Sequence, residues 1–290
     1  MRRILTIAVL LMVLLSVAQT ADGRRRRIRL RKPKVTVAQD IIRKVELKTF
    51  APILFGADSV VMDSPLRTMS EMGQESGTII YVCTLPEVKT AGILTIGSCH
   101  DNAQVFVDDE LAGRTDRIRH TLELPSVHDG QELKIQVDAI ERKNADDLVG
   151  LAEPIILTAD LDGHELTLNL RRWTILTIPD GYDTATKALE TVAADSLDSL
   201  APPDTSGKPG YYRFQAVFSR SGNIYLNMEN FGRGQVFVNG NSLGYFSETN
   251  PSLQVLRRYL KRGFNEVVVF DVVGPRQAVL SAQDQPTVGQ

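Results

Sequence analysis

Apolar and polar residues alternate over short stretches through most of this chain, and each stretch ends near Gly, Pro, Asn or Asp. A period of two is typical of β-strands with one buried face, because successive side chains point to opposite sides of a strand. Amphipathic helical stripes are scarce, so the pattern predicts an all-β fold. Between residues 77 and 180 it predicts strands in the segments IIYVCTL, GILTIGSC, AQVFVDD, HTLELP, LKIQVDAI, PIILTADL, HELTLNL and WTILTIP.

One of these patterns occurs twice, 131 residues apart. Residues 103–113 read AQVFVDDELAG and residues 234–244 read GQVFVNGNSLG, and the same offset relates Tyr81 to Tyr212. Each copy runs from an apolar strand into Asp-Asp or Asn-Gly, and Asn-Gly favours a hairpin whose turn needs positive φ. An offset common to two separate motifs indicates tandem copies of one module. We therefore expect two tandem antiparallel β-sandwiches of the jelly-roll type.

The turn and loop segments between the predicted strands, together with the N-terminal pattern, divide the chain into six parts. We expect a signal peptide (1–18), a basic arm and lead-in (19–49), a first β-sandwich (50–180), a linker (181–208), a second β-sandwich (209–280) and a tail (281–290). Because the second module is the shorter, it is expected to borrow a strand from residues 35–60. The linker segment TKALETVAADSLDSL predicts a short amphipathic helix, and the chain after Pro275 is expected to fray.

The N-terminus has the pattern of a secretory signal peptide. Two arginines follow Met1, an apolar run covers residues 4–15, and Ser16 and Ala18 supply the small residues of a cleavage site. The run is shorter than the roughly 20 residues of a spanning helix. Basic residues beyond it favour cytoplasmic retention of the downstream side, so an uncleaved anchor and a mislocated start codon are alternatives. Export with cleavage near Ala18 is our expectation.

Charge is divided between a basic arm and an acidic body. Residues 24–34 read RRRRIRLRKPK and carry eight basic residues, whereas residues 35–290 carry a net charge of about −11. The arm is interpreted either as a solvated linker or as an attachment to an anionic surface, such as headgroups, envelope polyanions or an acidic partner. Nucleic acid is not expected as a partner, because the body is acidic and the arm lacks interleaved aromatic residues.

Motifs that carry catalysis or bind metals are missing from the sequence. It has no Gly-rich phosphate loop and no His-Glu-x-x-His pair. The four histidines are not spaced as ligands on one element, and Asp108 and Asp109 fall on a hairpin turn. We expect neither a metal site nor a cofactor.

Cys83 and Cys99 each lie in a predicted strand of the first module. Export would permit a disulfide between them, provided that their Cα atoms lie within about 7 Å. Two buried thiols are an equal alternative. A nucleophilic cysteine is the weakest interpretation, because no base lies nearby in the sequence.

The motifs resemble the C-terminal β-domains of family 35 β-galactosidases. GTIIYVCTLP, CHDNAQVFVDDELAGRTDR and LKIQVDAIERKN resemble the first of these domains. PGYYRFQAVFSRSGNIYLNMENFGRGQVFVNGNSLGYF and LKRGFNEVVVFDVVGP resemble the second, a galactose-binding-like jelly roll. LKTFAPILF and PLRTMSEMGQ are similar to the lead-in that follows the catalytic barrel of those enzymes. The resemblance covers about residues 40–280.

The resemblance does not extend to the family's catalytic machinery. In that family two glutamates on a (β/α)8 barrel of about 250 residues perform retaining hydrolysis, and the barrel precedes the β-domains. Here the predicted signal peptide and arm stand in that place, and no residue matches a catalytic glutamate, so we predict no catalytic residue. Family positions that carry Trp or Arg also differ, as expected if contacts with a barrel or a glycan have relaxed: Val82, Phe231, Phe237, Tyr245 and Ser247.

Three functions remain open at this point. The favoured one is an exported, non-catalytic module that binds carbohydrate or protein, with Tyr245 as a stacking aromatic and Asn241 and Glu248 as polar ligands. The second is a β-galactosidase-family hydrolase component acting with a separately encoded barrel. The third is a structural module tethered to the envelope by the arm. The expected partners are a galactose-containing glycan, a glycoside hydrolase and an anionic envelope surface, and the expected location is periplasmic, extracellular or the cell surface.

Overall fold

The computed structural model describes most of the chain beyond residue 40. The described ranges are 41–62, 66–88, 90–99, 101–116, 118–140, 150–161, 164–195, 205–219 and 223–287. The predicted signal peptide and the basic arm lie outside the described residues. Within these ranges, no helix combines the length and the apolar character that crossing a membrane would need.

The first β-sandwich consists of a six-stranded sheet, β2-β11-β3-β8-β5-β6, and a four-stranded sheet, β10-β9-β4-β7. All pairings between the described strands of this sandwich are antiparallel, and every strand that the alternation predicts in this region is present. The apolar faces of the two sheets enclose one core around Trp173 and Tyr81. The strands are β2 (Asp58–Met62), β3 (Gly77–Thr84), β4 (Gly92–Cys99), β5 (Asn102–Val107), β6 (Glu110–Thr115), β7 (Thr121–Leu124), β8 (Glu132–Ala139), β9 (Leu151–Leu161), β10 (His164–Asn169) and β11 (Trp173–Ile178).

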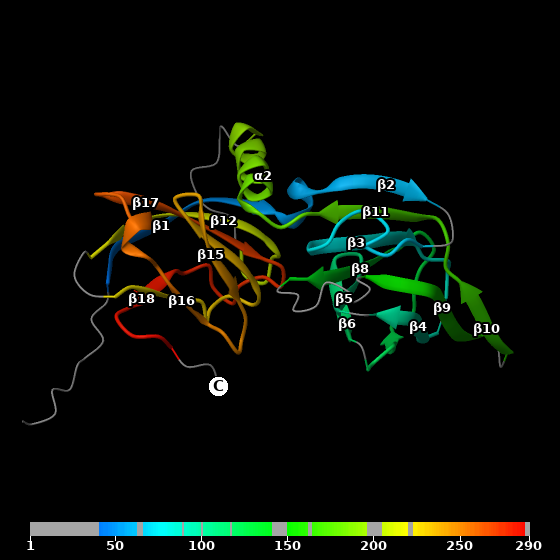
Figure 1. The fold of residues 1–290 in the computed structure, drawn as a ribbon. Helices are drawn as coiled ribbons and strands as arrows, with labels where there is room; N and C mark the ends of the chain where they lie inside the picture. The colour runs from blue at the N-terminus through cyan, green and yellow to red at the C-terminus, as the bar shows by residue number, and fades with distance from the viewer. Residues whose placement is uncertain are drawn as a thin grey trace, which may run out of the picture. The chain divides into compact units, whose positions relative to one another are not determined.

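The second β-sandwich pairs a five-stranded sheet, β1-β12-β17-β14-β15, with a three-stranded sheet, β16-β13-β18. Figure 1 shows the blue β1 lying among the yellow and orange strands of this sandwich, far from them in sequence. The expectation that the second module borrows a strand from residues 35–60 is confirmed. The strands are β1 (Ile42–Pro52), β12 (Gly210–Phe218), β13 (Tyr225–Asn227), β14 (Gly234–Val238), β15 (Asn241–Phe246), β16 (Ser252–Gln254), β17 (Phe264–Asp271) and β18 (Ser281–Gln283).

The expectation of a frayed chain after Pro275 is wrong. β18 forms an edge of the three-stranded sheet by pairing with β13. Leu280 and Ala282 are buried in the core of the second sandwich. Burial of these apolar side chains stabilises a terminal segment that its composition alone would leave unpaired.

The two sandwiches repeat one strand order, since β11-β3-β8-β5-β6 corresponds to β1-β12-β17-β14-β15. Both repeated hairpins turn with positive φ at both central residues, 47° and 68° at Asp108 and Asp109, and 50° and 82° at Asn239 and Gly240. These are the signs of φ that a type I′ turn requires. The tandem repeat predicted from the sequence is thus a repeat of structure.

The repeated tyrosines, Tyr81 and Tyr212, are buried and perform the same task. The hydroxyl of Tyr81 donates to the carbonyl of Arg67 at 3.1 Å, and that of Tyr212 donates to the carbonyl of Thr205 at 3.2 Å. Burial raises the pKa of both phenols well above their ordinary value. Each tyrosine therefore fastens the segment that precedes its strand, because a buried hydroxyl needs a partner.

One helix, α2 (Tyr182–Asp195), covers part of the outer face of the five-stranded sheet. Ala185, Ala188 and Leu189 pack against Phe237 and Val268. The helix begins four residues before the segment in which the sequence predicts it, and the end of that segment lies outside the described residues. A short 3-10 turn, η1 (Ile53–Gly56), follows β1, and η2 (Arg257–Tyr259) precedes β17.

The turn after β17 is held by the carboxylate of Asp271, which is fully buried. Its oxygens accept the backbone N–H groups of Gly232 (3.0 Å), Val273 (3.0 Å) and Gly274 (3.0 Å), and of Arg233 at 3.4 Å. The carbonyl of Val272, in the same turn, accepts from Gln104 and Gln136 of the first sandwich at 3.1 and 2.7 Å. Asp271 therefore shapes the turn through which the second sandwich contacts the first.

Asp271→Ala is expected to lower the free energy of unfolding by about 1–3 kcal/mol, because it strips buried N–H groups of their acceptor. Urea unfolding followed by the fluorescence of Trp173, the single tryptophan, measures this loss. Asp129→Ala, in an exposed turn, is the matched control and should change stability by less than about 0.5 kcal/mol. Equal, small effects for the two variants would contradict the role given to Asp271.

Candidate functional site: a pocket where the two sandwiches meet

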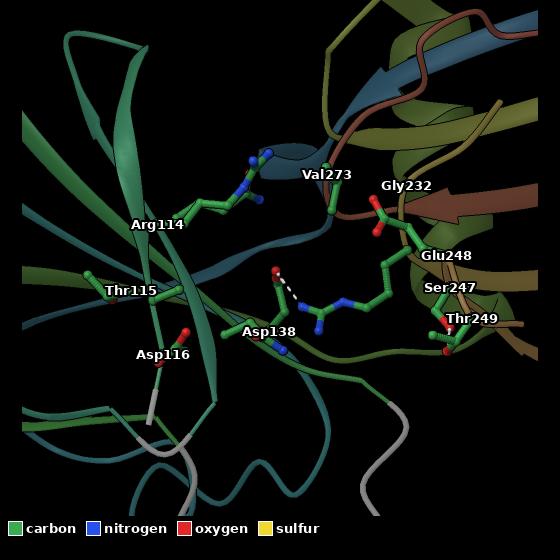
Figure 2. Close-up of a pocket in the computed structure, with 13 residues that line it drawn as sticks. Arg114, Thr115, Asp116, Asp138, Gly232, Ser247, Glu248, Thr249 and Val273 are labelled. Atoms are coloured by element: carbon green, nitrogen blue, oxygen red, sulfur yellow. Dashed lines mark hydrogen bonds and ion pairs between the residues drawn. The ribbon is translucent and has the colours of Figure 1, made fainter. Parts of the chain in front are cut away.

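A polar pocket of about 630 Å³ opens at the junction of the two sandwiches. Its volume falls within the range usual for ligand sites. One wall comes from β5, β6 and β8, and the other from the turns that precede β14 and follow β15 and β17 (Figure 2). Its lining includes five residues with charged side chains: Arg114, Asp116, Asp138, Arg233 and Glu248.

The floor of the pocket contains an ion pair between the sandwiches. Nη2 of Arg233 lies 3.1 Å from Oδ2 of Asp138, whose side chain is buried. The same carboxylate accepts from Oγ1 of Thr78 and from Nε2 of Gln136, each at 3.1 Å. Burial raises the pKa of Asp138 to about 6, although the Arg233 guanidinium and these hydrogen bonds act to lower it. The pair therefore joins the two walls and fixes the position of both groups.

Local sequence explains why these two side chains meet. Asp138 alternates with the core residues Val137 and Ala139 on β8, so it points to the outer face of its sheet, toward the second sandwich. Arg233 stands between two glycines in the turn before β14. A Cβ on Gly234 would lie 1.7 Å from the carbonyl oxygen of Phe270, so only glycine allows this turn to lie against β17.

Arg114 and Glu248 extend toward the pocket from opposite walls (Figure 2). Both are exposed, and neither side chain forms an ion pair or a hydrogen bond within the described part of the chain. Nε of Arg233 is buried and also lacks an acceptor among the described residues. The site thus presents an unpaired carboxylate and an unpaired guanidinium to any occupant, above one buried N–H donor that has no acceptor among the described residues.

The structure places the three sequence-predicted ligand residues apart. Glu248 lines the pocket, whereas the hydroxyl of Tyr245 donates to Oδ2 of Asp180 at 2.6 Å beside α2. Asn241 donates to the carbonyls of Val238 and Asn239 at 3.2 and 3.1 Å and so closes its own hairpin turn. Neither Tyr245 nor Asn241 lines the pocket.

The sequence repeat contains a signal for one pocket residue, Arg114. Arg114 stands 131 residues before Tyr245, the offset of the repeat, and the two pair with equivalent residues, Gln104 and Gln235. The position is therefore the same in both modules, but only its first copy faces the junction. Asp138 and Arg233 carried no such signal, because their importance depends on how one sandwich meets the other.

Cys83 and Cys99 lie in opposite sheets of the first sandwich, and both are buried free thiols. Burial raises the pKa of Cys83 to about 12 and that of Cys99 to about 11. The buried-thiol alternative is confirmed, and these pKa values leave almost no thiolate at neutral pH. Within the described ranges, no group of three His, Cys, Asp or Glu residues is arranged to hold a metal.

Two family models match this chain. Residues 65–177 match "Beta-galactosidase, first all-beta domain", and residues 209–265 match "Beta-galactosidase, galactose-binding domain". Together these ranges make up more than half of the chain. The chain belongs to the β-galactosidase family through these two accessory domains.

Curated relatives agree with this assignment. The chain is 26% identical over 229 residues to β-galactosidase-1-like protein 3 of Mus musculus, with 77% of this chain and 32% of that protein covered. It is 26% identical over 224 residues to β-galactosidase-1-like protein 2 of Homo sapiens, covering 75% and 32%. It is 27% identical over 209 residues to a β-galactosidase of Xanthomonas manihotis, covering 69% and 31%. The chain thus spans about a third of the length of these relatives.

Among solved structures, a lectin from Pleurotus ostreatus in complex with GalNAc aligns with 84% of this chain and 85% of its own. The alignment has a sequence identity of 12% and a TM-score of 0.29.

Arg233→Gln is expected to lower the free energy of unfolding by about 2–4 kcal/mol near neutral pH, because it leaves the buried Asp138 carboxylate without its cation. The pKa of Asp138 is raised from an ordinary 3.8 to about 6, so the folded state binds this proton more tightly than the unfolded state does. The stability that protonation of Asp138 contributes is therefore greatest below pH 3.8 and is lost as pH rises through 6. Without Arg233 the carboxyl stays protonated to higher pH, so the deficit should shrink at about pH 5.

Urea unfolding of the Arg233 variant at about pH 5 and about pH 7.5, followed by Trp173 fluorescence, tests this pH dependence. Arg114→Gln removes an unpaired guanidinium from the same pocket and should leave stability within about 0.5 kcal/mol. A deficit of the same size at both pH values would mean that Asp138 does not titrate against Arg233.

Proposed function

We propose that this chain is a non-catalytic carbohydrate-binding protein, and that the pocket between its sandwiches holds a galactose-containing glycan. The observation that carries the proposal is the pair of unpaired, opposed groups, Arg114 and Glu248, above a floor fixed by Asp138 and Arg233. Sugar hydroxyls both donate and accept, so one ligand can satisfy a carboxylate and a guanidinium at once. The family name of the second domain supports galactose as the sugar.

The pocket favours a neutral sugar over a charged one. Its floor charges, Asp138 and Arg233, already neutralise each other at 3.1 Å. The two wall charges, Arg114 and Glu248, are of opposite sign. A ligand with an added carboxylate or amine would gain one attraction and meet one repulsion, whereas hydroxyls gain from both walls.

A second function is participation in β-galactoside hydrolysis beside a separately encoded barrel. Its support is the match of both domains to proteins named β-galactosidase or β-galactosidase-like over 69–77% of this chain. In this role the same pocket would hold substrate for a partner enzyme rather than for this chain, whose described residues form two β-sandwiches and one helix.

We further propose that the protein acts after export. The apolar run of residues 4–15 and the small residues Ser16 and Ala18 support a cleaved signal peptide. The basic segment 24–34 would then hold the mature chain near an anionic envelope surface.

Arg114→Ala should raise the Kd for a galactose-terminated oligosaccharide at least about tenfold, because the ligand loses charge-assisted hydrogen bonds. Isothermal titration of the full chain measures the change. Arg119→Ala, an exposed arginine outside the pocket lining, is the matched control and should leave Kd unchanged. Tyr245→Phe tests the alternative site, since a large effect there and none at Arg114 would move the sugar to the second hairpin.

The purified full chain is expected not to hydrolyse an aryl β-galactoside, because no pair of carboxylates in the described pocket is free to act as acid and nucleophile. Asp138 is paired with Arg233, and Asp116 accepts the backbone N–H groups of Ile118 and Arg119 at 2.8 and 2.9 Å. Retaining hydrolysis needs two such carboxyl groups about 5 Å apart. Turnover that is abolished by Glu248→Gln would overturn the non-catalytic assignment.

A further inference from the structure

A second charged surface lies on the second sandwich, away from the pocket described above. β1, β12 and β17 lie side by side in the five-stranded sheet. The charged surface lies on the outer face of these strands, around a hollow of about 260 Å³. We call this surface the basic face and define it by Lys44, Lys48, Arg213, Lys261 and Arg262. Strand register explains its position, because Lys44 pairs with Val217, which in turn pairs with Phe264.

The cations of the basic face outnumber its acids. Glu266 is engaged by Nε of Arg213 at 3.0 Å and by the hydroxyl of Tyr182 at 2.5 Å, and Glu46 by Lys48 at 2.8 Å. Lys261 and Arg262 are exposed, and their side chains have no partner within the described residues. This excess stands on a body whose net charge is about −11. A cluster of positive charge on a negatively charged body favours the binding of an anionic partner at that place.

The turn that carries the two unpaired cations is held in place. Asn265 is 1% exposed, and its Oδ1 accepts the N–H of Lys261 at 2.7 Å while its Nδ2 donates to the carbonyl of Gly263 at 3.0 Å. Asn239 donates to the carbonyl of Tyr259 at 2.7 Å and to Oδ1 of Asn265 at 2.9 Å. Cations on a fixed turn lose less entropy on binding than cations on a mobile one.

An aromatic ring lies within the same face. Phe264 is 48% exposed, and Nζ of Lys44 lies 5.4 Å from the centroid of its ring. The hollow beside it is lined by Lys48, Arg213 and Lys261. An exposed ring next to a cation-lined hollow matches a sugar unit that carries a carboxylate or a sulfate, because the ring packs on the sugar and the cations bind the anion. A planar headgroup surface does not enter such a hollow.

We propose that the basic face binds an acidic polysaccharide. This site is distinct from the pocket between the sandwiches, takes a charged rather than a neutral glycan, and does not depend on that pocket's function. It also differs from the basic segment 24–34, since it belongs to the folded sandwich.

The test uses the full chain with the eight basic residues of segment 24–34 replaced by glutamine, so that only the folded part contributes. Polygalacturonate and dextran sulfate are the probes, and neutral dextran is the blank. The parent is expected to bind both polyanions with an affinity that falls as salt rises. Lys44→Gln/Lys261→Gln/Arg262→Gln should weaken binding at least tenfold, whereas Arg67→Gln/Arg119→Gln/Arg171→Gln, an equal charge change on the first sandwich, should leave it within twofold.

Three results would overturn the proposal: equal binding by both triple variants, loss of all binding in the parent, or binding only to anionic vesicles or duplex DNA. Unchanged Trp173 fluorescence and melting temperature would show that the variants fold. Titration of the basic-face variant with the neutral galactose-terminated oligosaccharide separates the two sites. That titration should match wild type if the pocket binds galactose, whatever the basic face does.

Discussion

The arrangement of this protein depends on a carboxylate that is buried where two domains meet. The side chain of Asp138 is buried, and the free-energy cost of removing its carboxylate from water is offset by one guanidinium and two neutral donors that contact it. The guanidinium belongs to Arg233, which the other sandwich supplies on a turn fixed by Asp271. Two buried carboxylates thus determine this contact. Asp271 fixes the conformation of the turn, and Asp138 binds the Arg233 side chain that the turn carries. The polar pocket exists because the residues around this pair cannot pack as an apolar core would.

Much of the fold was predictable from the sequence because its signals are local. Alternation identified the strands of the first sandwich, and the turn pairs Asp108-Asp109 and Asn239-Gly240 identified both hairpins through the φ values that they favour. The borrowed strand β1 was predictable because the second module is shorter in sequence than the first. The paired β18 was not, since three residues with Pro and Gln nearby carry no periodic signal, and only burial of Leu280 and Ala282 specifies it.

The site was less predictable, because sequence distance says little about how two domains meet. The sequence predicts Glu248 as a polar ligand after a hairpin, and Glu248 lines the pocket. It predicts Tyr245 and Asn241 in the same way, but Tyr245 donates to Asp180 beside α2 and Asn241 donates to the backbone of its own hairpin. Arg114 and Arg233 lie on different sandwiches, so no motif contains both. The position of the candidate site is determined by the contact between the two sandwiches, and neither contacting face carries a recognisable motif in its own module.

The repeat shows how one strand order acquires two environments. On β8 the outer-face residues are polar, Gln136 and Asp138, and they meet the turns of the other sandwich. On the corresponding β17 they are Val268 and Phe270, and α2 covers them. The inner face of a strand packs in the core of its own sandwich, so its residues must be apolar in both copies. The residues of the outer face are constrained only by the element that packs against them. The two binding surfaces that we propose accordingly lie where outer faces differ between copies, at the junction and on the part of the five-stranded sheet that the helix leaves uncovered.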